Sequence, residues 1–133
     1  MIKNESVYSR MYKLFLDDER LPSHVKWVTL PNGPWVVVRN YDHFVKYIMQ
    51  HGLPSFVTFD HDLGIEHYAQ GFSGTTPTYE NYKEKTGYEC VKWLVEYCMN
   101  NNLEFPEYQV HSMNPIGGKN IRSYIESYKK SKK

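Results

Sequence analysis

The chain has 133 residues, 41% of them hydrophobic and 23% charged, and its formal net charge at pH 7 is +1. This length predicts a single domain over residues 1–133, with a hydrophobic core at about 13–128. The near-neutral charge argues against duplex DNA or a membrane surface as the partner, and no segment approaches the ~20 apolar residues of a membrane span. Because the N-terminus lacks a signal-peptide pattern, we expect a soluble, cytoplasmic protein.

Four short apolar segments predict β-strands, the first two of them buried, and helical periodicity predicts helices between and after them. The strands are expected at 14–16, 35–39, 55–59 and 108–110, and the helices at about 41–51, 87–100 and 115–128. Asn40 or Asp42 can cap the first helix, and Gly52 can end it. Strands that alternate with helices along the chain form a parallel sheet with helices on both faces. The predicted fold class is therefore α/β, with about four parallel strands.

Residue types at the expected helix ends support these boundaries. Thr86 and Glu89 have the spacing of a capping box, in which both side chains satisfy backbone amides at a helix start. Asn114 can cap the last helix, and Pro115 suits its first turn. After that helix, residues 129–133 are expected to form a solvated basic tail.

Acidic and other polar side chains follow three of the predicted strands. Asp17, Asp18 and Glu19 follow the first strand, residues 60–62 (Asp-His-Asp) follow the third, and residues 111–112 (His-Ser) follow the fourth. In an open parallel sheet, ligands bind beyond the carboxyl ends of the strands. Carboxylates that lie close together repel one another, and a hard divalent cation with oxygen ligands compensates them. The alternative is that Asp17 or Asp18 merely caps a turn or a helix.

The segment 65–85 has no clear periodicity and carries several aromatic residues. Structureless loops longer than about 12–15 residues in a compact domain are usually functional or disordered. We therefore expect a substrate lid here, in which Tyr79 or Tyr82 stacks on a base.

The cysteines Cys90 and Cys98 both fall in the helix predicted at 87–100. A separation of eight residues places them about 12 Å apart along the helix, which is too far for a disulfide. Without suitably spaced histidines they form no zinc site, so we expect reduced core thiols.

Four motifs, in order, resemble the cyclic-phosphate processing receiver-like domain, a shortened relative of response-regulator receivers. The motifs lie within about 13–125 and are Leu16–Arg20, Phe59–Gly64, Thr86-Gly87 with Trp93-Leu94, and His111–Gly117. The resemblance implies a flavodoxin-like, three-layer fold and occurrence in a bacterial cell or phage-infected host. It also implies a role in processing cyclic phosphates at RNA ends or on ADP-ribose derivatives.

Carried over residue by residue, the resemblance places Asp17 and Asp18 where receivers hold Mg²⁺. It places Asp60 where receivers carry the phosphorylated aspartate, and Ser112 at the hydroxyl that follows the fourth strand. A receiver also needs a fifth strand that ends in a lysine, and the residues after Ser112 suffice only for one helix and a tail. Lys119, near the start of that helix, is the candidate substitute.

The expected mechanism uses a divalent cation, Mg²⁺ or Mn²⁺, on Asp17, Asp18 and Asp60 as a Lewis acid on the phosphate. His61 and His111 are the candidate general base and general acid, although a buried structural role is the commoner outcome for either histidine alone. The candidate phosphate or substrate contacts are polar residues near the strand ends, namely Arg20, Asp62, Ser112, Asn114 and Lys119.

The expected substrate is a small nucleotide or an RNA end. Two rival functions remain open: a signalling module that accepts phosphate on Asp60, and a module that binds a cyclic nucleotide without turnover. A metal nuclease would share the carboxylates but should present a more basic channel. The sequence leaves the oligomeric state open.

Overall fold

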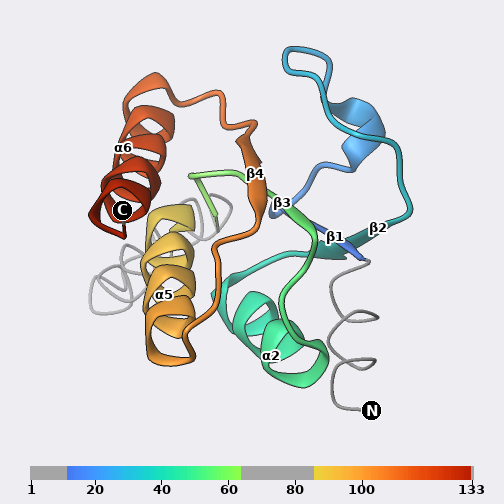
Figure 1. Ribbon diagram of the computed structural model, residues 1–133. Coiled ribbons are helices and arrows are strands. Elements are labelled where there is room, and N and C mark those ends of the chain that lie inside the picture. Colours follow the sequence, from blue (N-terminus) through green and yellow to red (C-terminus); the bar gives the residue numbers. More distant parts are fainter. Residues whose placement is uncertain (1–11, 64–85, 133) are drawn as a thin grey trace, which may run out of the picture.

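The computed structural model describes residues 12–63 and 86–132. The expected lid over 65–85, with Tyr79 and Tyr82, lies outside the described residues. Four parallel strands form one sheet in the order β2-β1-β3-β4 (Figure 1). The strands are β1 (Lys13–Leu16), β2 (Trp35–Val38), β3 (Phe56–Phe59) and β4 (Glu107–Val110).

The described helices alternate with these strands as the sequence predicts. They are α2 (Tyr41–His51), α5 (Gly87–Asn100), α6 (Pro115–Ser131) and a short 3-10 helix, η1 (Pro22–His24). The α/β, receiver-like fold class is therefore confirmed. Among the described residues, no helix has the length and apolar character that crossing a bilayer requires.

The two faces of the sheet are covered differently. Leu14 and Leu16 of β1 pack into one hydrophobic cluster with apolar residues of α2, α5 and α6. Phe15, between them, points to the opposite face, where its ring contacts Trp35 edge-on and stacks on His111. Figure 1 shows the three helices along one side of the sheet and the segment that carries η1 on the other. Among the described residues, the expected helices on both faces are thus found on one face only.

The strands differ in burial because of their position in the sheet. Leu14, Phe15 and Leu16 in β1, a central strand, have no exposed surface. The prediction that 35–39 is buried is wrong for most of β2, since β2 is an edge strand and only Val38 is fully buried. An edge strand has a neighbour on one side only, so part of its surface stays accessible.

Two predicted helix starts are confirmed by their capping contacts. Asn40 Oδ1 accepts a hydrogen bond from the His43 amide at 2.8 Å, and Gly52 ends α2 with a φ of 84°. Asn114 Oδ1 accepts from the Gly117 amide at 2.9 Å, with a proline in the first turn of α6. Asparagine thus supplies the cap at both starts, and of the two candidates for α2 the capping residue is Asn40, with Asp42 in the first turn.

The capping box predicted at Thr86 is wrong. Thr86 is the residue that precedes α5, but its side chain makes no capping hydrogen bond. The start of α5 is held by tertiary contact instead, because the Gly87 amide donates to the His61 carbonyl at 2.9 Å.

The predicted basic tail begins inside a helix. α6 continues to Ser131, and Lys129 and Lys130 are exposed in its last turn. Positive side chains are favourable there because they lie near the negative end of the helix dipole.

Candidate functional site

Three carboxylates converge at the carboxyl edge of the sheet. Asp17 directly follows β1 and Asp60 directly follows β3, and these two strands are paired with Leu16 opposite Phe59. One oxygen each from Asp17, Asp18 and Asp60 lies within 4.8 Å of the others. Closely spaced carboxylate oxygens are the donor set that hard divalent cations prefer. These three aspartates therefore fit the metal site that the sequence predicts.

Asp17 is fully buried and accepts four hydrogen bonds. Its Oδ1 accepts from the backbone amides of Glu19 at 2.9 Å and Arg20 at 2.8 Å. Its Oδ2 accepts from His111 Nε2 at 3.0 Å and from Arg20 Nη1 at 3.2 Å. Asp17 thus also caps a turn, as the alternative interpretation of the sequence proposed. Burial by itself raises the pKa of Asp17, but the hydrogen bonds from His111 and the two amides outweigh it and hold that pKa well below its usual value.

Asp60 has the opposite electrostatic character. It is almost fully buried, and burial together with the neighbouring charge of Asp17 raises its pKa to about 7. The guanidinium of Arg20 opposes this rise, with Nη1 3.9 Å from Asp60 Oδ2. Two adjacent carboxylates whose pKa values are pushed apart are typical of a functional site.

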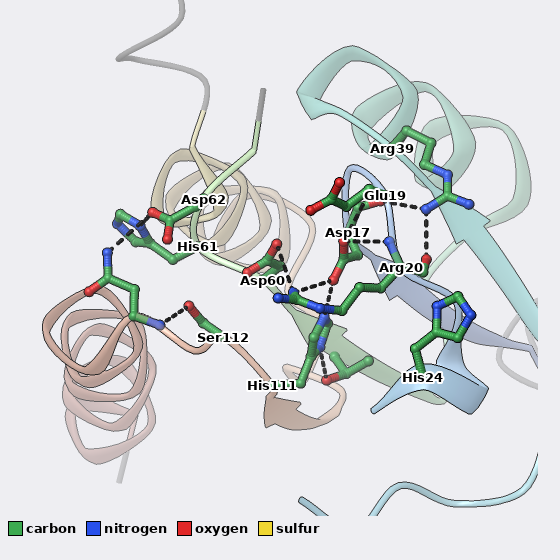
Figure 2. A network of polar contacts seen from close by, with 12 residues as sticks. Asp17, Glu19, Arg20, His24, Arg39, Asp60, His61, Asp62, His111 and Ser112 are labelled. Carbon is green, nitrogen blue, oxygen red and sulfur yellow. Dashed lines mark hydrogen bonds and ion pairs between the residues drawn. The ribbon is translucent and has the colours of Figure 1, made fainter. Parts of the chain in front are cut away.

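Two basic residues organise the turn that carries the acidic cluster. Arg20 contacts the carboxylates of Asp17 and Asp60, and its guanidinium carbon lies 5.3 Å from the centre of the Trp27 ring. Arg39, which directly follows β2, donates from Nη1 to the carbonyl oxygens of Asp17 at 3.1 Å and Arg20 at 2.6 Å (Figure 2). Arg39 therefore fixes the backbone of the turn from Asp17 to Arg20.

His111 is a buried neighbour of Asp17. Its ring is fully buried, stacks on Phe15 and bonds Asp17 through Nε2 and Thr58 Oγ1 through Nδ1, the latter at 2.8 Å. Because the carboxylate accepts from Nε2, the Thr58 hydroxyl can donate to Nδ1 of a neutral ring. Both ring nitrogens are therefore engaged within the protein. The predicted proton transfer by His111 stays a prediction, and this geometry favours an orienting role toward Asp17.

His61 belongs to a second group beside the acidic cluster (Figure 2). Its Nδ1 lies 2.8 Å from Asp62 Oδ1, which also accepts from Asn114 Nδ2 at 3.2 Å. An Nδ1–H bonded to a carboxylate leaves Nε2 as the basic nitrogen of the ring. Ser112 Oγ accepts from the backbone amide of Asn114 at 3.1 Å and completes the group. Asp62 and Asn114, predicted as substrate contacts, thus hold His61 in this structure.

Gly117 makes room for this histidine. A Cβ at Gly117 would lie 2.4 Å from His61 Cγ, so any larger residue would displace the imidazole. In the structure, the space beside Gly117 is therefore occupied by the His61 ring.

The remaining predicted contact, Lys119, is exposed on α6. In the described part of the chain, Arg20 forms ion pairs with both Asp17 and Asp60, and His111 pairs with Asp17. Sequence reasoning missed Trp27, Arg39 and Thr58. Arg39 could have been found, because it follows a strand whose carboxyl end meets the same edge as Asp17.

Comparison with known proteins agrees with this arrangement. Residues 12–127 match the family model of the cyclic-phosphate processing receiver domain. The curated proteins and the solved structures compared with the chain gave no match. The match spans every described strand and helix except the last turn of α6. The chain therefore belongs to the cyclic-phosphate processing receiver domain family.

Proposed function

We propose that this protein is a metal-dependent hydrolase that opens a cyclic phosphate on a ribose to a phosphate monoester. The substrate classes are an RNA end with a 2′,3′-cyclic phosphate and a cyclic phosphate of ADP-ribose. The observation that carries the proposal is that two different groups share one edge of the sheet: the cluster of Asp17, Asp18 and Asp60, and the His61–Asp62 pair. The family name supports the cyclic phosphate as substrate.

The acidic cluster would hold the cofactor. Asp17, Asp18 and Asp60 offer three oxygen donors to Mg²⁺ or Mn²⁺. When bound, such an ion supplies Lewis acidity toward the phosphate oxygens. Arg20 and the Ser112 hydroxyl are the proposed phosphate contacts, since a guanidinium and a hydroxyl can both donate to phosphate oxygens.

His61 is the proposed general base. Water adds to phosphorus, the ring P–O bond breaks, and the departing ribose oxygen gains a proton. Asp62 holds Nδ1 of the imidazole, so Nε2 can take the proton from water. The side chain of His61 is 20% exposed, so solvent reaches the ring. We propose that the ribose oxygen takes its proton from this solvent.

His111 is the proposed positioning residue for Asp17. Its buried ring bonds Asp17 Oδ2 and is fixed in turn by Thr58, so the orientation of the carboxylate depends on it. A histidine and a carboxylate bonded in this way restrict each other's rotation, as outer-sphere partners of metal ligands commonly do.

The test is phosphorus NMR of the purified protein with a panel of cyclic phosphates, in Mg²⁺ and in EDTA. We expect the cyclic resonance of a ribose-linked substrate to be replaced by that of a monoester in Mg²⁺, and Asp17→Asn to abolish the conversion. If a cyclic nucleotide binds but no panel member is converted, the protein is a binding module instead.

A further inference from the structure

The Asp17 carboxylate has no acceptor position to spare. A carboxylate offers about four acceptor positions on its two oxygens. Four donors approach them: the amides of Glu19 and Arg20, His111 Nε2 and Arg20 Nη1. A cation that binds Asp17 must therefore displace one of these donors.

The guanidinium of Arg20 is the donor best able to leave. The two amides belong to a turn that Arg39 fixes, and His111 has no exposed surface. The Arg20 side chain is 26% exposed, and its 3.2 Å bond to Asp17 is the longest of the four. Its approach to Asp60 is longer still, at 3.9 Å.

The guanidinium of Arg20 already lies over the ring of Trp27. The centre of the indole lies 5.3 Å from Arg20 Cζ, within the range of a cation–π interaction. The residue is 40% exposed, yet its ring is held in place because Nε1 donates to the His111 carbonyl at 2.8 Å. A guanidinium that leaves the carboxylates can therefore remain against the indole.

We propose that Arg20 is the built-in counter-ion of the acidic cluster and that a divalent cation exchanges with it. In the exchanged state the guanidinium rests on Trp27 and is available to a phosphate. The single positive charge of Arg20 then no longer competes for the oxygens of Asp17. The side chain thus sets the concentration of divalent cation at which the site fills. This inference rests on the metal site of the proposed function and adds a competitor to it.

Titration calorimetry of the metal-free full chain with Mg²⁺ tests the competition. Arg20→Met should bind Mg²⁺ about ten- to hundredfold more tightly than wild type, the equivalent of one charge-assisted hydrogen bond that the ion no longer breaks. The matched control is Arg122→Met, which removes the same charge from a guanidinium that donates to the Val110 carbonyl. Its affinity should stay within about threefold of wild type, because screening weakens more distant charge effects. Equal or weaker affinity in Arg20→Met than in the control overturns the inference.

A second variant and an optical readout cover the case in which Arg20→Met does not fold. Arg20→Lys keeps the charge but lacks the planar fork, so its Mg²⁺ affinity should fall between those of wild type and Arg20→Met. An affinity of Arg20→Lys at or below that of wild type contradicts the competition. Mg²⁺ should also change the tryptophan fluorescence of wild type, and Trp27→Phe should lose that change. A wild-type spectrum that stays constant at saturating Mg²⁺ contradicts the exchange onto the indole.

These outcomes separate the inference from the proposed function. If wild type and Arg20→Met bind Mg²⁺ equally, the counter-ion role fails while the metal site stands. If neither binds Mg²⁺, the counter-ion role and the metal site fail together. Turnover of a cyclic phosphate in EDTA then decides independently whether the protein is still a hydrolase.

Discussion

His61 and His111 differ sharply, although each follows a strand and neighbours a residue of the site. His111 is buried, with Asp17 and Thr58 on its two nitrogens, whereas His61 is partly exposed beside Asp62. The difference follows from the alternation of side chains along a strand. Val110 packs with the helices, so His111 points to the opposite face, the face of Asp17. His61 comes two residues after Phe59, another residue of the helix side, and its ring meets α6 at Gly117.

This comparison distinguishes His61, the proposed general base, from His111, the proposed positioning residue. A histidine on the helix side reaches the rim of the site, and a histidine on the opposite face is enclosed between Phe15, Thr58 and Asp17. Substitutions at the two positions should therefore affect different quantities.

The largest expected effect is on turnover in His61→Ala. Removing the general base should lower the rate on a ribose cyclic phosphate by about 10²–10⁴. Mg²⁺ affinity, measured by calorimetry, should stay within a few-fold of wild type, because His61 bonds Asp62, which lies outside the group of carboxylates proposed to hold the ion. A wild-type rate in this variant would return His61 to a purely structural role.

The next effect is on stability in His111→Ala. This substitution leaves a buried carboxylate and a buried hydroxyl without their partner, and each buried polar group left unsatisfied costs about 1–3 kcal/mol, with the larger cost for the charged carboxylate. Urea denaturation should show this loss, while His61→Ala should change the free energy of unfolding by less than about 1 kcal/mol. Similar stabilities for the two variants would remove the distinction between the histidines.

Gly117→Ala should disturb the His61 side of the comparison. The added Cβ would lie 2.4 Å from the imidazole, and overpacking of this kind costs about 1–3 kcal/mol. Turnover should fall as His61 is displaced, with Mg²⁺ affinity retained. Gly118→Ala is the matched control, since a Cβ there meets its nearest atom at 3.5 Å. Equal turnover in the two glycine variants would show that the position of the His61 ring does not depend on Gly117.

The smallest effect concerns the pH dependence of stability in metal-free protein. The pKa of Asp60 is raised from 3.8 to about 7, so between these values the folded state holds a proton that the unfolded state has released. This group therefore lowers the free energy of unfolding as pH rises from about 4 to 7. Asp17, with a lowered pKa, acts in the opposite sense and at lower pH.

Asp60→Asn should remove the decrease in the free energy of unfolding that the ionisation of Asp60 causes as pH rises. We expect the variant to gain on the order of 1–2 kcal/mol over wild type between pH 5 and pH 8, measured by urea denaturation in EDTA. A constant difference between variant and wild type across this pH range would contradict the raised pKa.

The sequence predicted the sheet and the meeting of the carboxylates because both depend on local patterns. Apolar runs such as Leu14–Leu16 define strands, and parallel strands bring their carboxyl ends to one edge. The capping box at Thr86 failed because a tertiary contact of Gly87 with the His61 carbonyl holds the helix start instead. A local motif cannot report a contact of that kind.

The supporting residues could not be predicted in the same way. Trp27 and the His111 carbonyl are 84 positions apart, and His111 and Thr58 are 53 apart. Such pairs depend on strand register, which the hydrophobic pattern did not fix. The different placement of the two histidines, however, follows from counting alternate residues onward from Phe59 and Val110 once the helix-covered face is known.

The most direct test of the central claim is the reaction of wild type with a nucleoside 2′,3′-cyclic phosphate and Mg²⁺ in water enriched in oxygen-18. We predict a monoester whose phosphate carries one oxygen-18 atom by mass spectrometry, because water adds to phosphorus as the ring opens. His61→Ala should form this product about 10²–10⁴ times more slowly. Recovery of the cyclic phosphate unchanged, or of a monoester without the label, would contradict the assignment of this edge of the sheet as a hydrolytic site.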